Sequence, residues 1–222
     1  MESKFRAFEN SILNCAGLTA HFQDIKTDKK LLKADIIHLD ETHITDETDA
    51  STLALNGFSD YFINVGKGKG IATYISENIT ATSTAFKGSR LQIVKVSMKE
   101  IDSINVYRST NKSIIETWET LEEFIDTEKA TVVTGDFNLC LRKYKTNLLL
   151  TGLSNVGFGQ LQCEASQIMG GNLDHVYWRD PQGQWEKPCL ERYSPFFSDH
   201  DGFLITLKKK AKKKSKLNRR KK

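Results

Sequence analysis

The fold is decided by the stretch Thr131-Val-Val-Thr-Gly-Asp-Phe-Asn138, a β-branched run that ends at a glycine and then presents an acid and an amide. Valine and threonine suit a buried, pleated strand, and Gly135 can adopt the backbone angles needed where a strand becomes a loop. The run therefore predicts a buried strand that holds Asp136 and Asn138 at the rim of a sheet, a rigid place for chemistry. The same two residues also fit an Asx-type turn with no further role, and this stretch alone does not decide between the two.

The segments before this stretch alternate between strand and helix. Residues 91–98 and 104–107 are apolar runs that predict strands. Ser113-Ile-Ile-Glu116 is a capping box, and the apolar residues after it recur at helical spacing, so we expect an amphipathic helix that ends near Asp126. Strand, helix and strand in this order predict a layered α/β protein.

Further acids stand beside predicted strands elsewhere in the chain. A strand expected at residues 34–39 runs into Asp40-Glu41, and Asp199-His200 directly precedes a strand expected at residues 202–207. Asp174 lies inside an otherwise apolar strand expected at residues 170–177, where a carboxylate is costly unless it is paired or bound to a metal. His200 is its natural partner. An acidic loop or a structural histidine would explain each feature alone, but together they favour a chemical site.

Composition limits the class of protein. The chain has 222 residues, 39% of them hydrophobic and 27% charged, which fits one globular domain without a Pro/Gly/Ser-rich linker. Its longest apolar runs are too short to span a membrane and its N-terminus lacks the apolar core of a signal peptide, so we expect a soluble intracellular protein with no membrane partner. The four cysteines show no metal-binding spacing and are expected to be buried, reduced thiols.

Basic residues are concentrated at the C-terminus. Residues 208–222 contain 11 of the 32 Lys and Arg residues and no acid, so residues 1–207 hold 21 basic and 28 acidic residues, a net charge of −7. Because a run of like charge repels itself, we expect residues 1–207 to form the domain and residues 208–222 a disordered tail. The tail is interpreted as a nucleic-acid arm or a nuclear localisation signal, hence a nuclear protein; a solubilising end or a truncated linker is the alternative.

Six short motifs, in their order along the chain, resemble the endonuclease/exonuclease/phosphatase superfamily, which includes apurinic/apyrimidinic endonucleases and the endonuclease domains of non-LTR retrotransposons. The matching residues are Asn14 in Leu-Asn-Cys-Ala-Gly-Leu, Glu41 in Leu-Asp-Glu-Thr-His, Tyr107 in Asn-Val-Tyr-Arg, Asp136 and Asn138 in Gly-Asp-Phe-Asn, Asp174 in Leu-Asp-His-Val, and Asp199 and His200 in Ser-Asp-His. The Glu-Thr-His and Leu-Asp-His-Val-Tyr phrases look most like endonuclease domains of mobile elements. The resemblance implies an α/β fold, a four-layer α/β/β/α sandwich of two packed mixed sheets flanked by helices.

The resemblance also implies a metal site. Family members hold Mg²⁺ or Mn²⁺ through the glutamate that Glu41 matches, with help from residues that match Asn14 and Asp199, and a hard cation prefers such oxygen ligands. Two positions depart from the pattern. Many relatives carry an acid where this chain has Ala16, and retroelement relatives often show a Thr-His pair where it has Ser166-Gln167, which puts one phosphate contact in doubt.

The remaining matches imply how water and phosphate are handled. Asp136 would orient or deprotonate the attacking water, Asn138 would hold a phosphate oxygen, and Tyr107 would contact the phosphate or the leaving group. His200, oriented by Asp174, would stabilise the charge that develops at phosphorus. The assignment of the general base to Asp136 or to His200 stays open.

These implications predict a Mg²⁺-dependent endonuclease that nicks DNA by in-line attack of water on a phosphodiester. A phosphatase on phosphoinositides or other small phosphate esters, or a catalytically silent nucleic-acid-binding module, stays open as an alternative. DNA is the expected partner, with other domains or proteins of a mobile element if the chain is a fragment of one. Arg108, Arg142 and Lys143 are predicted to touch nucleic acid, and specificity would depend on surface loops such as residues 43–70 and 139–147.

Overall fold

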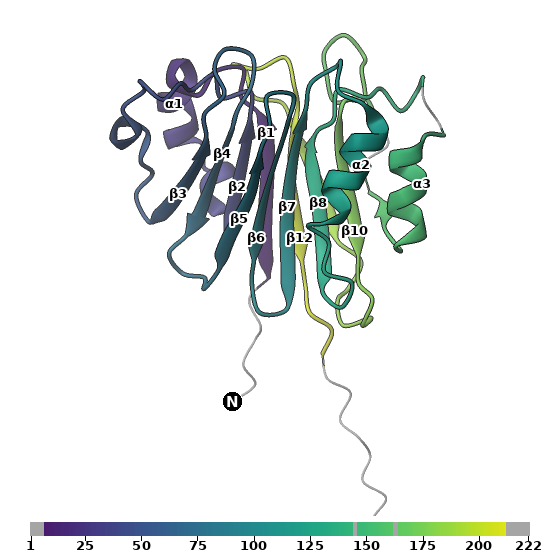
Figure 1. Cartoon of the computed structure of the whole chain (residues 1–222). Coiled ribbons are helices and arrows are strands. Elements are labelled where there is room, and N and C mark those ends of the chain that lie inside the picture. The colour runs from purple at the N-terminus through teal and green to yellow at the C-terminus, as the bar shows by residue number, and fades with distance from the viewer. Residues whose placement is uncertain (1–6, 144–145, 162–163, 212–222) are drawn as a thin grey trace, which may run out of the picture.

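The computed structural model describes residues 7–143, 146–161 and 164–211, and its strands form two mixed sheets that pack face to face (Figure 1). The first sheet consists of β1 (Phe8–Asn14), β2 (Ile36–Asp40), β3 (Phe58–Ile63), β4 (Ile71–Ser76), β11 (Cys189–Tyr193) and β12 (Gly202–Leu207). The second consists of β5 (Thr82–Lys87), β6 (Leu91–Ser97), β7 (Ile101–Arg108), β8 (Ala130–Asp136), β9 (Gly159–Gln160) and β10 (Asp174–Arg179). The strand orders are β11-β12-β1-β2-β4-β3 and β5-β6-β7-β8-β10-β9.

Helices cover the outer faces of both sheets. α1 (Leu18–Thr27) packs on the first sheet, while α2 (Ile114–Glu122) and α3 (Leu148–Asn155) pack on the second (Figure 1). Two 3-10 turns, Leu31–Lys33 and Ala50–Leu53, complete the described helical segments. Three apolar cores separate the layers, so the predicted four-layer α/β/β/α sandwich is confirmed. None of the helices in the described part of the chain is long and apolar enough to cross a membrane.

The central strand β8 is buried on both faces. Val132 belongs to the core between the two sheets and Val133 to the core beneath α2 and α3, because successive side chains of a strand point to opposite faces. This double burial explains the unbroken β-branched run. Gly135 has φ +143°, and a Cβ atom there would lie 1.9 Å from the carbonyl oxygen of Val106 in β7. Only glycine lets the strand end pass its neighbour so closely.

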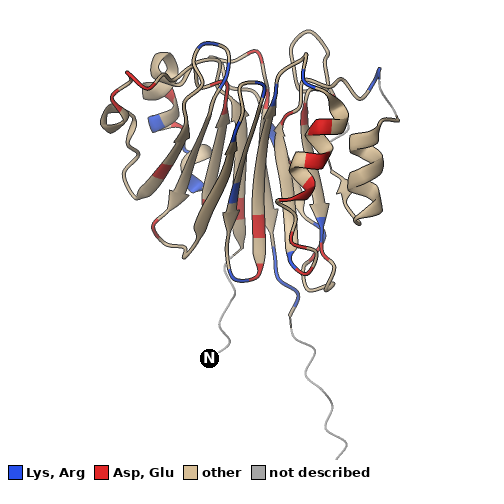
Figure 2. Ribbon diagram, in the orientation of Figure 1, with Lys and Arg blue, Asp and Glu red and all other residues tan. Residues whose placement is uncertain are grey.

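α2 begins as expected but ends earlier. The Ser113 hydroxyl oxygen accepts the backbone N–H of Glu116 at 3.4 Å, the cap that the sequence predicted. The helix stops at Glu122 rather than near Asp126, because the N–H groups of Phe124 and Ile125 donate to carbonyls three residues back and tighten the last turn. Figure 2 shows acidic residues along the outer face of α2. That face is therefore unsuited to a polyanion.

Two other expectations need correction. The strand expected at residues 170–177 begins only at Asp174, because residues 166–171 form a turn in which Ser166 N donates to Gly171 O at 2.8 Å. The cysteines are not uniformly buried: Cys15 is buried, Cys140 is half-buried and Cys189 is exposed, and residue 163 lies outside the described residues.

The start of the expected tail is part of the folded domain. Glu186 N donates to Lys208 O and Lys210 N donates to Gln184 O, each at 2.8 Å, so the ordered backbone reaches three residues beyond Leu207. Residues 212–222 of the expected tail lie outside the described residues.

Four strands end at one edge of the sandwich, the upper edge in Figure 1. β1 and β2 are parallel, and so are β7 and β8. β12 runs antiparallel to β1 and pairs Leu207 with Phe8, so it ends at the opposite edge. Seven residues of strand at about 3.3 Å each place the end of β12 about 20 Å from the upper edge.

Candidate active site

Asp136 is the centre of a buried network at this upper edge. Its Oδ2 accepts Asn14 Nδ2 from the end of β1 at 3.0 Å, and its backbone N donates to Asp40 Oδ2 at the end of β2 at 3.0 Å. Its Oδ1 accepts the backbone N–H of Asn138 at 2.9 Å, which is an Asx turn. The strand therefore holds Asp136 at the rim of a sheet, as predicted, and Asp136 and Asn138 also form an Asx turn. The turn exists, and it fixes Asp136 between the sheets.

Asp174 and His200 complete this network. Asp174 is the first residue of β10 and lies directly opposite Asp136 in the strand register. His200 Nδ1 lies 2.7 Å from Asp174 Oδ2, so the predicted pairing of these two residues is confirmed. One ligand atom from each of Asp136, Asp174 and His200 falls within 4.8 Å of the others. Segments 26 to 64 residues apart in sequence therefore present two carboxyl groups and an imidazole to one small volume.

Burial and mutual repulsion set the charges of this cluster. Burial raises the pKa of Asp136 well above its ordinary value, and the neighbouring charge of Asp174 raises it further. Burial would lower the pKa of His200, but the hydrogen bond and charge of Asp174, with the charges of Asp136 and Asp199, outweigh it and raise the pKa to about 9. At neutral pH the imidazole is therefore protonated and offsets the two acids.

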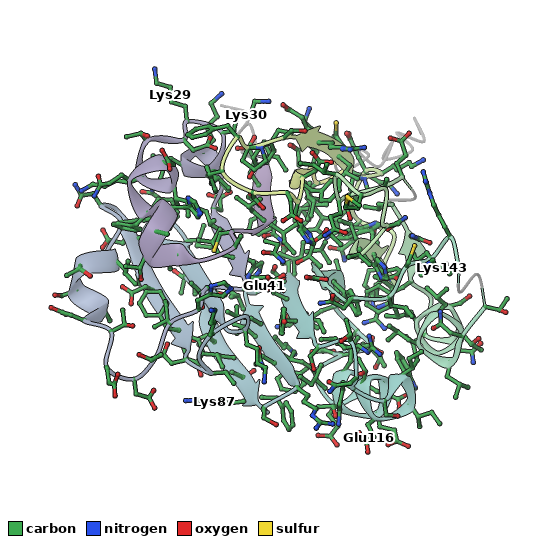
Figure 3. The ribbon with its side chains drawn as sticks, turned by 90° about the horizontal axis from the view of Figure 1, so that it is seen from above. Lys29, Lys30, Glu41, Lys87, Glu116 and Lys143 are labelled. Atoms are coloured by element: carbon green, nitrogen blue, oxygen red, sulfur yellow. The ribbon has the colours of Figure 1, made fainter. Side chains whose placement is uncertain are left out.

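Glu41 and Tyr107 form a second contact at the same edge. The Tyr107 hydroxyl lies 2.8 Å from Gly68 O and 3.3 Å from Glu41 Oε1, to which it can donate. Burial and the charge of Glu41 raise the pKa of Tyr107, so the phenol stays protonated. Figure 3 looks down on this edge and places Glu41 near its centre. A phenol that remains a donor next to a carboxylate suits contact with an anionic ligand.

Asp40 and Asn105 are site residues whose roles the sequence did not reveal. Asn105 Nδ2 donates to Asp40 Oδ1 at 2.6 Å, while Asp40 Oδ2 holds the backbone of Asp136. Burial, opposed by these two hydrogen bonds, raises the pKa of Asp40 to about 8. A signal was present, because Asp40 directly follows one predicted strand and Asn105 lies within another. Their pairing across the two sheets is not visible in a linear sequence.

Ser166 and Gln167, the two residues that depart from the family pattern, contact residues of the site. Ser166 Oγ accepts the backbone N–H groups of Leu173 and Asp174 at 3.1 and 3.0 Å, which fixes the start of β10. Gln167 Nε2 donates to Asp199 Oδ2 at 3.0 Å. These two residues therefore position acids of the site, although neither had been given a role.

The residues predicted to touch nucleic acid lie in different environments. Arg108 is only 4% exposed, and its guanidinium donates to Phe137 O at 2.8 Å and to Lys112 O at 2.5 Å, so it braces the loop after β8. Asn138, in this loop, donates its Nδ2–H to the carbonyl oxygen of Arg108 at the end of β7, at 3.0 Å. Arg142 and Lys143 are exposed, and Lys143 lies near the rim of the view in Figure 3. Lys143 thus remains available to a ligand.

The edge has the donor set that a hard divalent cation requires. The carboxyl groups of Glu41, Asp136, Asp174 and Asp199 lie at this edge, and the His200 imidazole is bonded to Asp174. Asp174 Oδ1 is buried without a hydrogen-bond partner among the described residues. Such an oxygen is costly unless a cation or a donor reaches it. Among the His, Cys, Asp and Glu residues in the described part of the chain, Asp136, Asp174 and His200 form a group with metal-ligand spacing.

Comparison with known proteins finds a family whose model matches most of this chain. The profile of the Endonuclease/Exonuclease/phosphatase family matches residues 12–200, which include every residue of the buried network around Asp136. No curated protein sequence matches the chain significantly.

Solved structures share the fold at low identity. The endonuclease domain of TRAS1, a telomere-specific non-LTR retrotransposon, superposes with a TM-score of 0.63 at 13% identity over 91% of this chain and 98% of that one. The 3′ phosphatase NExo from Neisseria, bound to a product DNA hairpin, gives 0.69 at 15% identity over 92% and 100%. An AP endonuclease from Archaeoglobus fulgidus gives 0.67 at 14% identity over 89% and 98%.

Proposed function

Because the chain belongs to the endonuclease/exonuclease/phosphatase family of metal-dependent phosphoester hydrolases, we propose that it is a Mg²⁺-dependent endonuclease that nicks DNA. The observation that carries the proposal is the buried Asp136, Asp174 and His200 cluster. Its two acids stand side by side in neighbouring strands, and a protonated imidazole lies against them. Buried acidic and basic groups that lie together and shift one another's pKa values are characteristic of catalytic sites.

In the proposed reaction Asp136 and His200 divide the work. The neighbouring acids raise the pKa of His200 to about 9 and so favour its protonated form, from which Nε2–H would donate to a phosphoryl oxygen as charge develops there. Asp136 would then orient the attacking water and accept its proton. Asp174 holds His200 Nδ1 at 2.7 Å and thereby aims Nε2 away from the buried carboxylates.

The proposed metal ligands are Glu41, Asn14 and Asp199, with Mg²⁺ or Mn²⁺ as the ion. A bound divalent ion would offset charge on the scissile phosphate and the leaving oxygen. Asn14 Nδ2 donates to Asp136, and Gln167 Nε2 donates to Asp199. Side-chain hydrogen bonds therefore already orient two of the three proposed ligands. Tyr107, which lies within hydrogen-bonding reach of Glu41, and Asn138 would contact the phosphate.

DNA is the proposed substrate. Two of the structural neighbours are an endonuclease domain of a retrotransposon and a phosphatase bound to a DNA hairpin, and the chain ends in a dense basic segment. We infer that residues 1–207, extended by the bonded backbone to Lys210, form the catalytic domain, and that the basic segment that ends at residue 222 attracts DNA by counterion release and directs the protein to the nucleus. Arg142 and Lys143 would add phosphate contacts. Removal of a terminal 3′ phosphate from DNA is the second candidate, since one neighbour is a 3′ phosphatase.

The test is incubation of the purified full chain with supercoiled plasmid and Mg²⁺, with and without EDTA, beside Glu41→Ala and His200→Ala. We expect the wild type to convert supercoiled to nicked plasmid, and each variant to lose activity by about 100-fold or more. Equal nicking by wild type and both variants would sink the proposal. A DNA duplex with a 3′-terminal phosphate and a soluble phosphoinositide, assayed for released phosphate in parallel, separate the phosphatase alternatives.

A further inference from the structure

The loop of residues 66–70, between β3 and β4, lies against the site at the upper edge. Its sequence alternates glycine and lysine. The Tyr107 hydroxyl, a proposed phosphate contact, donates to the carbonyl oxygen of Gly68 at 2.8 Å. Lys67 and Lys69 are the two chain neighbours of Gly68, and their Cα atoms each lie about 3.8 Å from its own. Both lysines therefore stand beside the position proposed for the phosphate.

The same loop braces the segment that carries Glu41. The backbone N–H of His43 donates to the carbonyl oxygen of Lys69 at 2.9 Å. The backbone N–H of Thr42 donates to that of Gly70 at 3.4 Å. Glu41 itself has φ +50°, a left-handed conformation that residues other than glycine adopt only with support from their surroundings. The loop is thus bonded to the segment of the proposed metal ligand as well as to the proposed phosphate contact.

The loop is anchored at one end and open at its lysines. A Cβ atom at Gly70 would lie 2.5 Å from the Thr42 hydroxyl oxygen, so this end of the loop packs tightly on the site. A Cβ atom at Gly66 or at Gly68 would meet no other part of the described chain within 4 Å. The space around the lysines is therefore free for a ligand.

The charges of the two lysines are not paired with acids of the described chain. Lys67 is exposed and Lys69 is half-buried, and neither forms an ion pair with a described residue. Asp46, which follows the braced segment, lies 3.9 Å from Lys87 Nζ, so another lysine offsets its charge. Figure 2 shows basic residues in loops along this upper edge. The loop thus offers two ammonium groups to an anion at the site.

We propose that Lys67 and Lys69 bind backbone phosphates next to the phosphodiester that is cut. The inference rests on the proposed function and deepens it, because it identifies the substrate as a polynucleotide strand. A small phosphate ester would occupy the position beside Tyr107 and offer no second phosphate to the lysines. A strand carries further phosphates on both sides of the scissile one, and each ammonium group that pairs with a phosphate releases a counterion. The loop therefore favours a strand over a small phosphate ester.

The test measures binding without cleavage, by fluorescence anisotropy of a labelled DNA duplex in EDTA at several salt concentrations. In Lys67→Gln/Lys69→Gln the slope of log affinity against log salt should fall by about two, because two fewer counterions are released. Affinity at about 0.1 M salt should fall about tenfold. Lys67→Arg/Lys69→Arg keeps both charges and is expected to stay within about twofold of wild type.

The matched control is Lys99→Gln/Lys187→Gln, which removes the same charge from the opposite edge of the sandwich. Lys99 lies in the turn before β7, and Lys187 shortly precedes β11, whose Cys189 pairs with Thr206 near the end of β12. Both control lysines are exposed. We expect the control variant to keep the salt slope of the wild type, because its lysines lie far from the proposed path of the strand.

A second measurement relates the contact to cleavage. The KM for plasmid nicking in Mg²⁺ should rise about tenfold in Lys67→Gln/Lys69→Gln, because substrate binding is weakened. An unchanged salt slope, an equal loss in the control variant, or a lower kcat at unchanged KM would overturn the inference. Because binding in EDTA needs no catalysis, a wild type that nicks no plasmid contradicts the proposed function and leaves the binding result readable.

Discussion

Two buried polar clusters lie between the same pair of sheets, and they differ in charge. The inter-sheet cluster, midway along the strands, joins neutral groups: His38 Nδ1 lies 2.9 Å from the Thr73 hydroxyl and His38 Nε2 lies 2.8 Å from the Ser103 hydroxyl. The site cluster, at the strand ends, consists of Asn14, Asp136, Asp174 and His200. Burial lowers the pKa of His38 to about 3, while the pKa of His200 is raised to about 9 by its acids despite burial.

This difference separates a structural polar group from a functional one. The ring nitrogens of His38 are both satisfied by hydroxyl groups, and no acid takes part in its hydrogen bonds. The site cluster leaves Asp174 Oδ1 without a partner among the described residues and gathers acids that repel one another. Such an arrangement is unfavourable for folding alone and is expected where a ligand completes it. Burial and a histidine are common to both clusters, and the unbalanced charge distinguishes them.

The largest expected effect is that substitutions in the two clusters have opposite consequences: one lowers activity and the other lowers stability. Asp174→Asn should lower kcat/KM for plasmid nicking by about 100-fold or more, because His200 loses the carboxylate that orients and charges it, while stability changes by only about 1 kcal/mol. His38→Ala should do the reverse, costing about 2–4 kcal/mol of unfolding free energy through a cavity and the loss of the hydrogen bonds to Thr73 and Ser103. Urea unfolding and nicking rates measured on both variants check this. Loss of activity in a fully folded His38→Ala protein would contradict the distinction.

The next effect concerns the glycine that brings Asp136 to the site. Gly135→Ala should cost about 3 kcal/mol or more, because the added methyl group meets the β7 backbone at 1.9 Å and the residue keeps φ +143°. The matched control is Gly57→Ala, which also has positive φ but open space around it, and should cost about 1 kcal/mol. Thermal unfolding of both variants gives the difference. Similar losses in the two would show that the close approach to Val106 is unimportant.

The parts of the fold that the sequence predicted are those that are buried. The apolar runs at residues 5–13 and 71–75 also predict strands, so β1, β2, β4, β6, β7, β8 and β12 were all expected near their observed positions, because burial leaves apolar or β-branched runs. The strands without a prediction, β3, β5 and β11, are all edge strands. Their side chains are mostly exposed or half-buried, so burial did not shape their sequences. An edge strand is defined by the backbone partner beside it, and a single sequence does not specify that partner.

The site was predictable to the extent that its residues stand next to strands. Asp136, Asp174 and His200 each follow or precede an apolar run, and the structure brings them together. The hydrogen bonds of Asp40 and Ser166 were not predictable, because each depends on contacts between segments whose register the sequence does not state. The roles given to Glu41, Asn14 and Asp199 as metal ligands stay predictions. Arg108 carried a basic charge that suggested DNA, but its burial depends on the path of the loop after β8.

The smallest expected effect is in the pH dependence of stability, where the two histidines should act in opposite directions. His200 has a folded pKa of about 9, above its ordinary 6.5, so its stabilising contribution is complete below pH 6.5 and is lost as pH rises through 9. His38 has a folded pKa of about 3, so its contribution is complete above pH 6.5 and declines as pH falls below that value. The unfolding free energy of wild type minus that of His200→Gln should therefore shrink between pH 7 and 9, and wild type minus His38→Gln should shrink between pH 6 and 4. Urea titrations in EDTA at these pH values measure both differences, and parallel curves for either variant would show that its histidine does not titrate as its surroundings require.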